Sequence, residues 1–261
     1  MVGPEGVGHV IDFLGDTLVW FTEHWDGETG YLWRAWNTIL LCTVATLTAA
    51  LIATPLGALL GHYRRFGVVA VAVVNIGRAL PSFGIIALSL PITIRIASHI
   101  PNGVPIFGSG LGFFPAFIAL FLLALPPIFT NTYTGIREVD PGTVEAARGM
   151  GLSEGRILRT VEGPLASPVI IAGLRISAVQ VVATSPLAAL VAYKGLGRFI
   201  VDGFAVRDNV QIFAGAVLIA LLAVLTELTF SWLARRVVPR PLQTPGPVRR
   251  SDPELSLPAA W

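Results

Sequence analysis

A run of apolar residues without charge sets the strongest limit on the fold of this chain. From Trp36 to Leu60 no residue carries a charge. About 20 apolar residues of helix suffice to cross a hydrocarbon layer of about 30 Å, so this run predicts a transmembrane helix. The composition agrees, because 54% of the residues are hydrophobic and only 13% are charged, whereas a soluble domain has about 25% charged residues. Much of the surface is therefore expected to face lipid.

Further apolar runs follow the first one. They cover residues 67–90, with Arg78 and Pro81 inside; 111–136, with a Pro126–Pro127 pair expected to bend the helix; 169–193, which is more polar than the others; and 210–233. The sequence therefore predicts an all-α membrane protein with about five core transmembrane helices. Five spans place the two termini on opposite sides of the bilayer.

Basic residues are distributed unevenly between the two sides that these spans define. One side receives Arg64, Arg65, Arg137, Arg148, Arg156, Arg159, Arg235, Arg236, Arg240, Arg249 and Arg250. The other side receives Arg34, Arg95, Lys194, Arg198 and Arg207. Because loops rich in Lys and Arg face the cytoplasm, the distribution predicts a cytoplasmic C-terminus and an N-terminus outside the cell.

The ends of the chain differ from the spans in composition. Residues 1–35 do not resemble a signal peptide, because no basic segment comes first and Asp12 and Asp16 interrupt the apolar stretch. Apolar side chains recur there at helical spacing, at Val10, Phe13, Leu14, Thr17, Leu18 and Phe21, and tryptophans gather before the first span, at Trp20, Trp25, Trp33 and Trp36. We expect an amphipathic helix in the outer membrane interface with an aromatic belt. Residues 36–236 are then the transmembrane domain, and the proline-rich residues 237–261 a disordered cytoplasmic tail.

Residue types and spacings exclude several kinds of chemistry. A net charge of +2 gives no case for binding nucleic acid. The single lysine, Lys194, follows Tyr193, so the Gly-Lys-Ser/Thr core of an ATP-binding P-loop is missing. The histidines have no metal-ligand spacing, and neither Ser82 nor Ser185 has a histidine neighbour that would activate it. We therefore expect no enzyme activity, metal or cofactor in this chain.

A short charged segment between the third and fourth spans carries the most specific signal. Asp140 suits a helix N-cap and Pro141 the first helical position. The helix should end at Gly151, and Ser153 should cap a second short helix that ends at Gly163 and Pro164. The pattern predicts two helices along the cytoplasmic surface, with a knob formed by Val144, Ala147 and Met150. The structural alternative is an ordinary connector that covers helix ends.

The same segment resembles a known signature. Glu145-Ala146-Ala147, Gly151, Val161 and Pro164 match the EAA motif of ABC importer permeases, although that family has Leu where this chain has Gly163. In the family this loop, here about residues 137–168, docks into a cleft of a separate ATPase subunit. The resemblance implies that Glu145, Ala146, Ala147 and Gly151 make this contact. It also implies the type I importer permease fold in a bacterial plasma membrane, two ATPase copies, a second permease subunit and an extracytoplasmic solute-binding protein.

Within the family, the chain most resembles permeases for osmoprotectants such as glycine betaine, carnitine, choline and proline betaine. The matching stretches are residues 75–82, 130–136, 139–141 and 195–197. The resemblance implies ATP-driven uptake of these quaternary ammonium solutes. Methionine permeases share parts of the pattern, so another small solute such as methionine is the first alternative. A stand-alone secondary transporter or channel is the alternative from another class.

Polar residues inside the predicted spans are candidates for lining the transport pathway. They are Asn75, Arg78 and Ser82 in the second span, and Ser177, Gln180 and Thr184 in the fourth. Each set shares a helical face, and interhelical hydrogen bonding is the alternative role for both. Arg175 and Glu227 lie at similar depth in the fourth and fifth spans, and we hypothesise that they form an ion pair.

Overall fold

The computed structural model of this chain describes residues 4–27, 29–64, 72, 82–97 and 111–237. All regular elements among these residues are helical, which confirms the predicted fold class. They are α1 (Pro4–Glu23), α2 (Tyr31–His62), α4 (Ser82–Ala97), α5 (Phe113–Arg137), α6 (Pro141–Gly149), α7 (Glu154–Ile157), the π-helix η1 (Leu158–Glu162), α8 (Gly163–Thr184), the 3-10 helix η2 (Ser185–Val191), α9 (Gly197–Val206) and α10 (Asn209–Val237).

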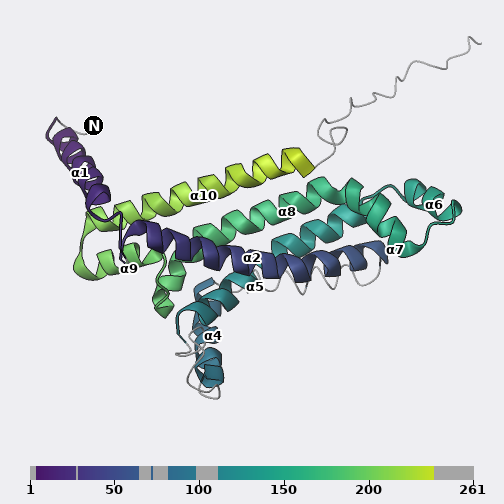
Figure 1. The fold of residues 1–261 in the computed structure, drawn as a ribbon, viewed down its shortest axis with the longest axis horizontal. Coiled ribbons are helices and arrows are strands. Elements are labelled where there is room, and N and C mark those ends of the chain that lie inside the picture. The colour runs from purple at the N-terminus through teal and green to yellow at the C-terminus, as the bar shows by residue number, and fades with distance from the viewer. Residues whose placement is uncertain (1–3, 28, 65–71, 73–81, 98–110, 238–261) are drawn as a thin grey trace, which may run out of the picture.

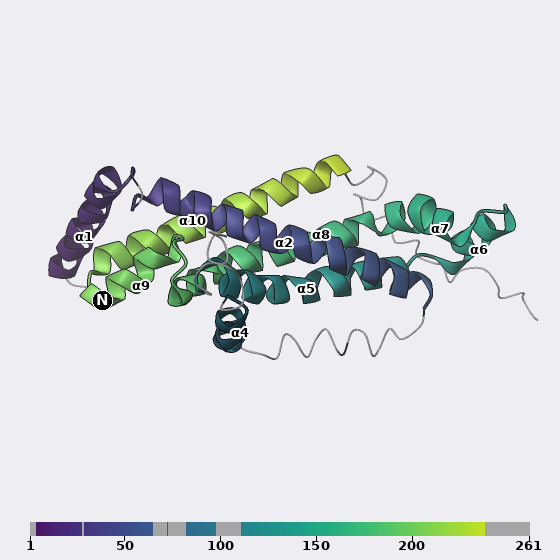
Figure 2. The same cartoon turned by 60° about the horizontal axis from the view of Figure 1, so that its bottom comes forward.

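Long helices run side by side along the long axis of the molecule (Figure 1). These are α2, α5, α8 and α10, and Figure 2 shows the same arrangement after rotation. The short helices α6 and α7 lie together at one end of this bundle, whereas α1 and α9 lie at the other end. Helix α4 projects from the side of the bundle.

Four helical stretches of the described chain are long and apolar enough to cross a membrane. They are Tyr31–His62, Phe113–Arg137, Glu154–Val191 and Asn209–Arg236. Most of the predicted second span, 67–90, lies outside the described residues. Its described end forms the start of α4, which runs past residue 90 to Ala97.

Small side chains hold α2 against α5. The buried face of α2 repeats every four residues, at Leu41, Ala45, Ala49, Ala53, Gly57 and Gly61, which is one ridge of a helix. A Cβ atom on Gly57 would lie 3.0 Å from the Phe129 carbonyl oxygen, and one on Gly61 would lie 2.9 Å from the Tyr133 carbonyl oxygen. Glycine is therefore required for the two backbones to approach this closely, as is common between helices in lipid.

The fourth span differs from its prediction at both ends. Gly163 and Pro164 do not end the preceding helix but begin α8. A proline ring clashes with the carbonyl four residues earlier in a regular helix, and here the wider π turn of η1 lies directly before it. At the other end, α8 ends at Thr184 and the 3-10 helix η2 begins at Ser185. Because Pro186 has no N–H to offer Val182, the Val182 carbonyl oxygen accepts from Ser185 instead, through its backbone N–H and through its hydroxyl at 2.8 Å.

Helix α1 forms over the predicted amphipathic segment. Its Phe13 ring contacts Phe213 of α10 at a centroid distance of 5.3 Å, and Trp20 contacts Phe199 of α9 at 5.0 Å. Trp20 is buried among these residues, so it belongs to the protein core and not to an exposed aromatic belt. The other tryptophans of the predicted belt, Trp25, Trp33 and Trp36, are exposed.

Candidate coupling segment and pathway residues

Local hydrogen bonds begin helix α6 as the sequence predicts. The Asp140 carboxylate accepts from the Thr143 backbone N–H at 2.8 Å and from the Thr143 hydroxyl at 3.0 Å. These two bonds stabilise the ionised carboxylate and so hold the pKa of Asp140 below its ordinary value, and the bond from the backbone N–H has the larger effect. Pro141 occupies the first turn, where its missing N–H is not needed. Asp140 is thus an ionised N-cap at neutral pH.

A left-handed glycine ends α6 and turns the chain toward α7. Met150 is the C-cap, and Gly151 has a φ of +84°, a conformation that glycine adopts without strain. The Leu152 N–H donates to the Ala147 carbonyl oxygen at 3.3 Å. The Ser153 side chain makes no capping hydrogen bond, contrary to prediction. Instead its backbone carbonyl accepts from Arg156 and Ile157, at 2.8 and 2.9 Å.

The two faces of α6 have opposite environments. Val144 and Ala147 are buried in an apolar cluster formed with the ends of α5 and α8, whose other buried members are Ile136, Val139, Ile157 and Ala166. Glu145, Ala146, Met150 and Gly151 are exposed. The expectation that Val144 and Ala147 project from the helix as part of a knob is therefore wrong, because the helix uses that face to attach to its own bundle. Only Met150 of the three, with 76% of its surface exposed, projects outward.

A chain of ionisable side chains connects the EAA segment, defined here as residues 140–162, to the end of α2. Arg148 donates to both carboxylate oxygens of Glu154, at 2.8 and 3.1 Å, and Glu154 raises the pKa of Arg148. Glu154 also lies 3.1 Å from His62 Nε2. The other ring nitrogen, His62 Nδ1, lies 2.6 Å from Glu162 Oε2. A hollow of about 230 Å³ lies beside these residues, between α2 and α6.

Sequence reasoning missed this chain of side chains. It treated His62 as an isolated histidine, since 100 residues separate it from Glu162 and no local spacing links the two. One available signal was that His62, just after the first predicted span, and Glu162, in the loop before the fourth, were expected on the same side of the membrane. Across the described residues, no group of His, Cys, Asp or Glu side chains could hold a metal ion.

The structure places the pathway candidates in different environments. Ser177 is completely buried and donates to the Ala124 carbonyl oxygen of α5 at 3.1 Å, which is the interhelical role and not an open lining position. Gln180 lines an open hollow of about 520 Å³ between α8 and α10. Thr184 is half-buried, and its hydroxyl donates to the Gln180 carbonyl oxygen. Asn75 and Arg78 lie outside the described residues, and Ser82 is described only as the first residue of α4.

An ion pair between α8 and α10 lies on the same hollow as Gln180. Arg175 and Glu227 contact each other directly, as hypothesised, and both line that hollow. Their attraction joins two helices at a position where an unpaired charge would be costly.

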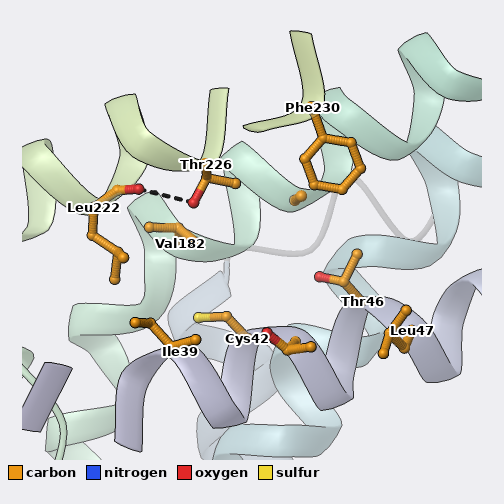
Figure 3. Close-up of a pocket in the computed structure, with 10 residues that line it drawn as sticks. Ile39, Cys42, Thr46, Leu47, Val182, Leu222, Thr226 and Phe230 are labelled. Carbon is orange, nitrogen blue, oxygen red and sulfur yellow. Dashed lines mark hydrogen bonds between the residues drawn. The ribbon is translucent and has the colours of Figure 1, made fainter. Parts of the chain in front are cut away.

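A second hollow between α2, α8 and α10 is almost entirely apolar. It holds about 130 Å³ and is lined by residues such as Cys42, Val182 and Leu222. Figure 3 shows Phe230 at one edge of this space, beside Thr226, whose hydroxyl donates to the Leu222 carbonyl oxygen at 2.8 Å. One aromatic ring does not form the cage that binds a quaternary ammonium ion. This hollow therefore offers no binding site for such a cation by itself.

At the far end of the bundle, glycines allow the loop before α9 to pack tightly. A Cβ atom on Gly197 would lie 2.5 Å from Pro186, and one on Gly195 would lie 2.7 Å from the Thr38 hydroxyl oxygen. The Leu196 N–H donates to that same hydroxyl at 2.9 Å. The Gly195-Leu196-Gly197 sequence thus fixes the connection between η2 and α9 against the start of α2.

These features define a multi-pass helical membrane protein that presents a short exposed helix pair at one end of its bundle. A family model for the inner membrane component of binding-protein-dependent transport systems matches residues 53–242. The chain belongs to this family, and it is therefore a permease subunit of an ABC importer. Subunits of this kind are not themselves catalytic.

Curated relatives and solved structures agree with this assignment. The choline transport permease OpuBB of Bacillus subtilis is 31% identical over 87% of this chain and 96% of its own length. The carnitine permease OpuCB of Listeria monocytogenes is 32% identical over 87% of this chain and 96% of its own length. Among solved structures, the MetNI methionine ABC transporter matches with a TM-score of 0.69 and 25% identity, over 80% of this chain and 97% of the other.

Proposed function

We propose that this chain is the membrane subunit of an ATP-driven importer for osmoprotectant quaternary ammonium solutes such as glycine betaine, carnitine and choline. An extracytoplasmic binding protein delivers the solute, a second permease subunit completes the pathway, and two copies of a separate ATPase supply the energy. Its similarity to OpuBB and OpuCB, whose names state choline and carnitine transport, supports this substrate class. The likeness to a methionine transporter makes methionine the second candidate.

The exposed face of α6 is the observation that carries the proposed coupling to an ATPase. Glu145, Ala146 and Met150 are open to a partner, while Val144 and Ala147 anchor the helix to the bundle. A small residue at Ala146 allows a partner surface to approach the helix backbone. A force applied to the exposed face is therefore transmitted to a rigidly attached helix and not to a loose loop.

The distribution of basic residues supports an orientation with α6 and the C-terminus in the cytoplasm. Arg137, Arg148, Arg156 and Arg159 lie in or next to the EAA segment, and Lys- and Arg-rich ends face the cytoplasm. Residues 36–236 are the proposed permease domain. On α8, the proposed pathway residues are Gln180 and Thr184. From the predicted second span, they are Asn75, Arg78 and Ser82.

The proposed function is tested by ATP hydrolysis in a reconstituted complex of permease, ATPase and binding protein. We expect glycine betaine to stimulate hydrolysis several-fold and methionine to leave it unchanged. Stimulation by methionine alone would replace the proposed substrate class with the second candidate. Failure of any ATPase to associate with the permease would contradict the coupling proposal itself.

A further inference from the structure

The end of α2 is linked to the EAA segment by buried polar contacts whose function the family assignment does not explain. The His62 and Glu162 side chains are only 4% and 6% exposed, and they approach to 2.6 Å. A carboxylate this well buried is costly unless a partner satisfies it. The positions of the His62 and Glu162 side chains relative to each other are therefore expected to stay fixed, because separating them would leave the buried carboxylate without its partner.

Glu154 extends this contact to the exposed part of the EAA segment. It accepts from Arg148 of α6 and lies 3.1 Å from His62 Nε2. His62 thus contacts Glu154 with one ring nitrogen and Glu162 with the other, before and after the α7–η1 turn. Arg148 comes from the same short helix as Glu145 and Ala146, which face outward. A displacement of α6 therefore acts on His62 through a single carboxylate.

The covalent chain alone provides a different route. It leads from α5 through residues 138–140 into α6, and from α6 through α7 and η1 into α8, so both α5 and α8 must follow any movement of the EAA segment. Helix α2 has no such covalent connection. Within the described residues, the apolar cluster beneath α6 includes from α2 the partly buried Ala58, and His62 supplies the polar contacts.

The same end of α2 is closely packed on α5. Gly61 is the residue before His62, and a Cβ atom there would lie 2.9 Å from the Tyr133 carbonyl oxygen and 3.0 Å from Ile136 Cβ. On this face the backbones of α2 and α5 are in contact, so the α2 terminus cannot shift toward α5 without displacing it. A force that reaches His62 is consequently transmitted to the α2–α5 pair as a unit.

We propose that His62 is a positioning residue that links α6 to α2 through the chain Arg148–Glu154–His62–Glu162. The linkage makes α2 move together with α5 and α8 when an ATPase displaces α6. This inference depends on the proposed function, because it assumes that an ATPase acts on α6. It assigns to a histidine outside the EAA motif the task of converting that motion into opening and closing of the bundle.

The test compares uptake with ATP hydrolysis in the reconstituted complex. His62→Gln keeps a hydrogen-bonding side chain but cannot bridge both carboxylates as the imidazole does. We expect it to retain the ATPase subunit and to hydrolyse ATP at a rate within threefold of the unmodified complex, while solute uptake per ATP falls about tenfold. His9→Gln, the same substitution at an exposed residue of α1, should leave both rates unchanged.

A second variant separates a role in coupling from simple loss of structure. The Glu154 side chain is 45% exposed, so Glu154→Gln should leave the fold intact. Like His62→Gln, this variant should lower solute uptake per ATP. If the residues act as one chain, the double variant should be no worse than His62→Gln alone, because residues of one network are not additive.

Three results would overturn the inference. They are an unchanged uptake per ATP in His62→Gln, loss of the ATPase subunit from that variant, and multiplicative effects in the double variant. A complex of the unmodified chain that fails to respond to binding protein and solute would instead refute the proposed function, so the two failures are distinguishable.

Discussion

The ion pair between Arg175 and Glu227 leads to a prediction whose size follows from the depth of both residues. Arg175 lies six residues, or about 9 Å, inside the predicted span 169–193, and Glu227 lies six residues, or about 9 Å, before the end of the predicted span 210–233. Both therefore lie within the hydrocarbon layer of about 30 Å, on the α6 side of its centre. A charge left unpaired at the centre costs about 3 kcal/mol, so at this depth we expect about 2 kcal/mol, which corresponds to roughly a 30-fold shift in the folding equilibrium.

Replacing either partner should therefore destabilise the protein by about 2 kcal/mol, whereas exchanging them should not. We expect Arg175→Ala and Glu227→Ala each to lower the free energy of unfolding by that amount. The exchanged pair, Arg175→Glu with Glu227→Arg, should recover most of the loss. The measurement is the unfolding of the purified protein in mixed micelles as the fraction of denaturing detergent rises.

The matched control is an ion pair that lies within one short helix. Arg198 and Asp202 are four residues apart on α9, and such pairs contribute only about 0.5 kcal/mol. Arg198→Ala should therefore have little effect. If the single variants of the α8–α10 pair lose no more stability than this control, or if the exchanged pair is no better than the single variants, the argument from depth in the membrane is wrong.

Further predictions concern the EAA segment. Ile157→Ala, which empties a completely buried position, should lower the free energy of unfolding by about 2–5 kcal/mol and weaken ATPase association because α6 loses its support. Met150→Glu changes an exposed position, so it should weaken ATPase association at least tenfold while thermal stability in detergent stays unchanged. The lowered pKa of Asp140 means that its cap is present above the ordinary Asp range and is lost as pH falls through the lowered value. The hydrogen-exchange protection of the Thr143 amide should follow that loss, and Asp140→Asn should remove this pH dependence.

Each of these has an outcome that would contradict it. Unchanged ATPase association in Ile157→Ala would show that α6 does not depend on the cluster beneath it. Normal association in Met150→Glu would place the ATPase contact elsewhere. A Thr143 protection factor that does not change between neutral and strongly acidic pH would rule out the ionised cap.

Local chemistry explains why the start and end of α6 could be predicted from the sequence. Asp140 and Pro141 act through hydrogen bonds and dihedral angles of neighbouring residues, and Gly151 adopts the positive φ that a helix end requires. These interactions do not depend on the rest of the fold. Gly163 and Pro164 carry an equally clear local stop signal, yet the chain continues through them, because a π turn makes room for the proline ring and no local pattern predicts that turn.

Interactions between distant residues limited the prediction of the candidate site. Helical spacing placed Ser177 on a polar stripe but could not tell which neighbour that stripe faces, and the structure shows it against α5. The same spacing could not reveal that Val144 and Ala147 pack inward. The contact between His62 and Glu162 depends on the packing of α2 beside η1, which only the assembled bundle provides.

The most direct test of the account is uptake of radiolabelled glycine betaine into proteoliposomes that contain the permease and its binding protein. The account predicts uptake only when the ATPase subunit is bound and ATP is supplied on the side of the membrane that α6 faces. Uptake driven by an ion gradient without any ATPase subunit would contradict it and identify the chain as a secondary transporter.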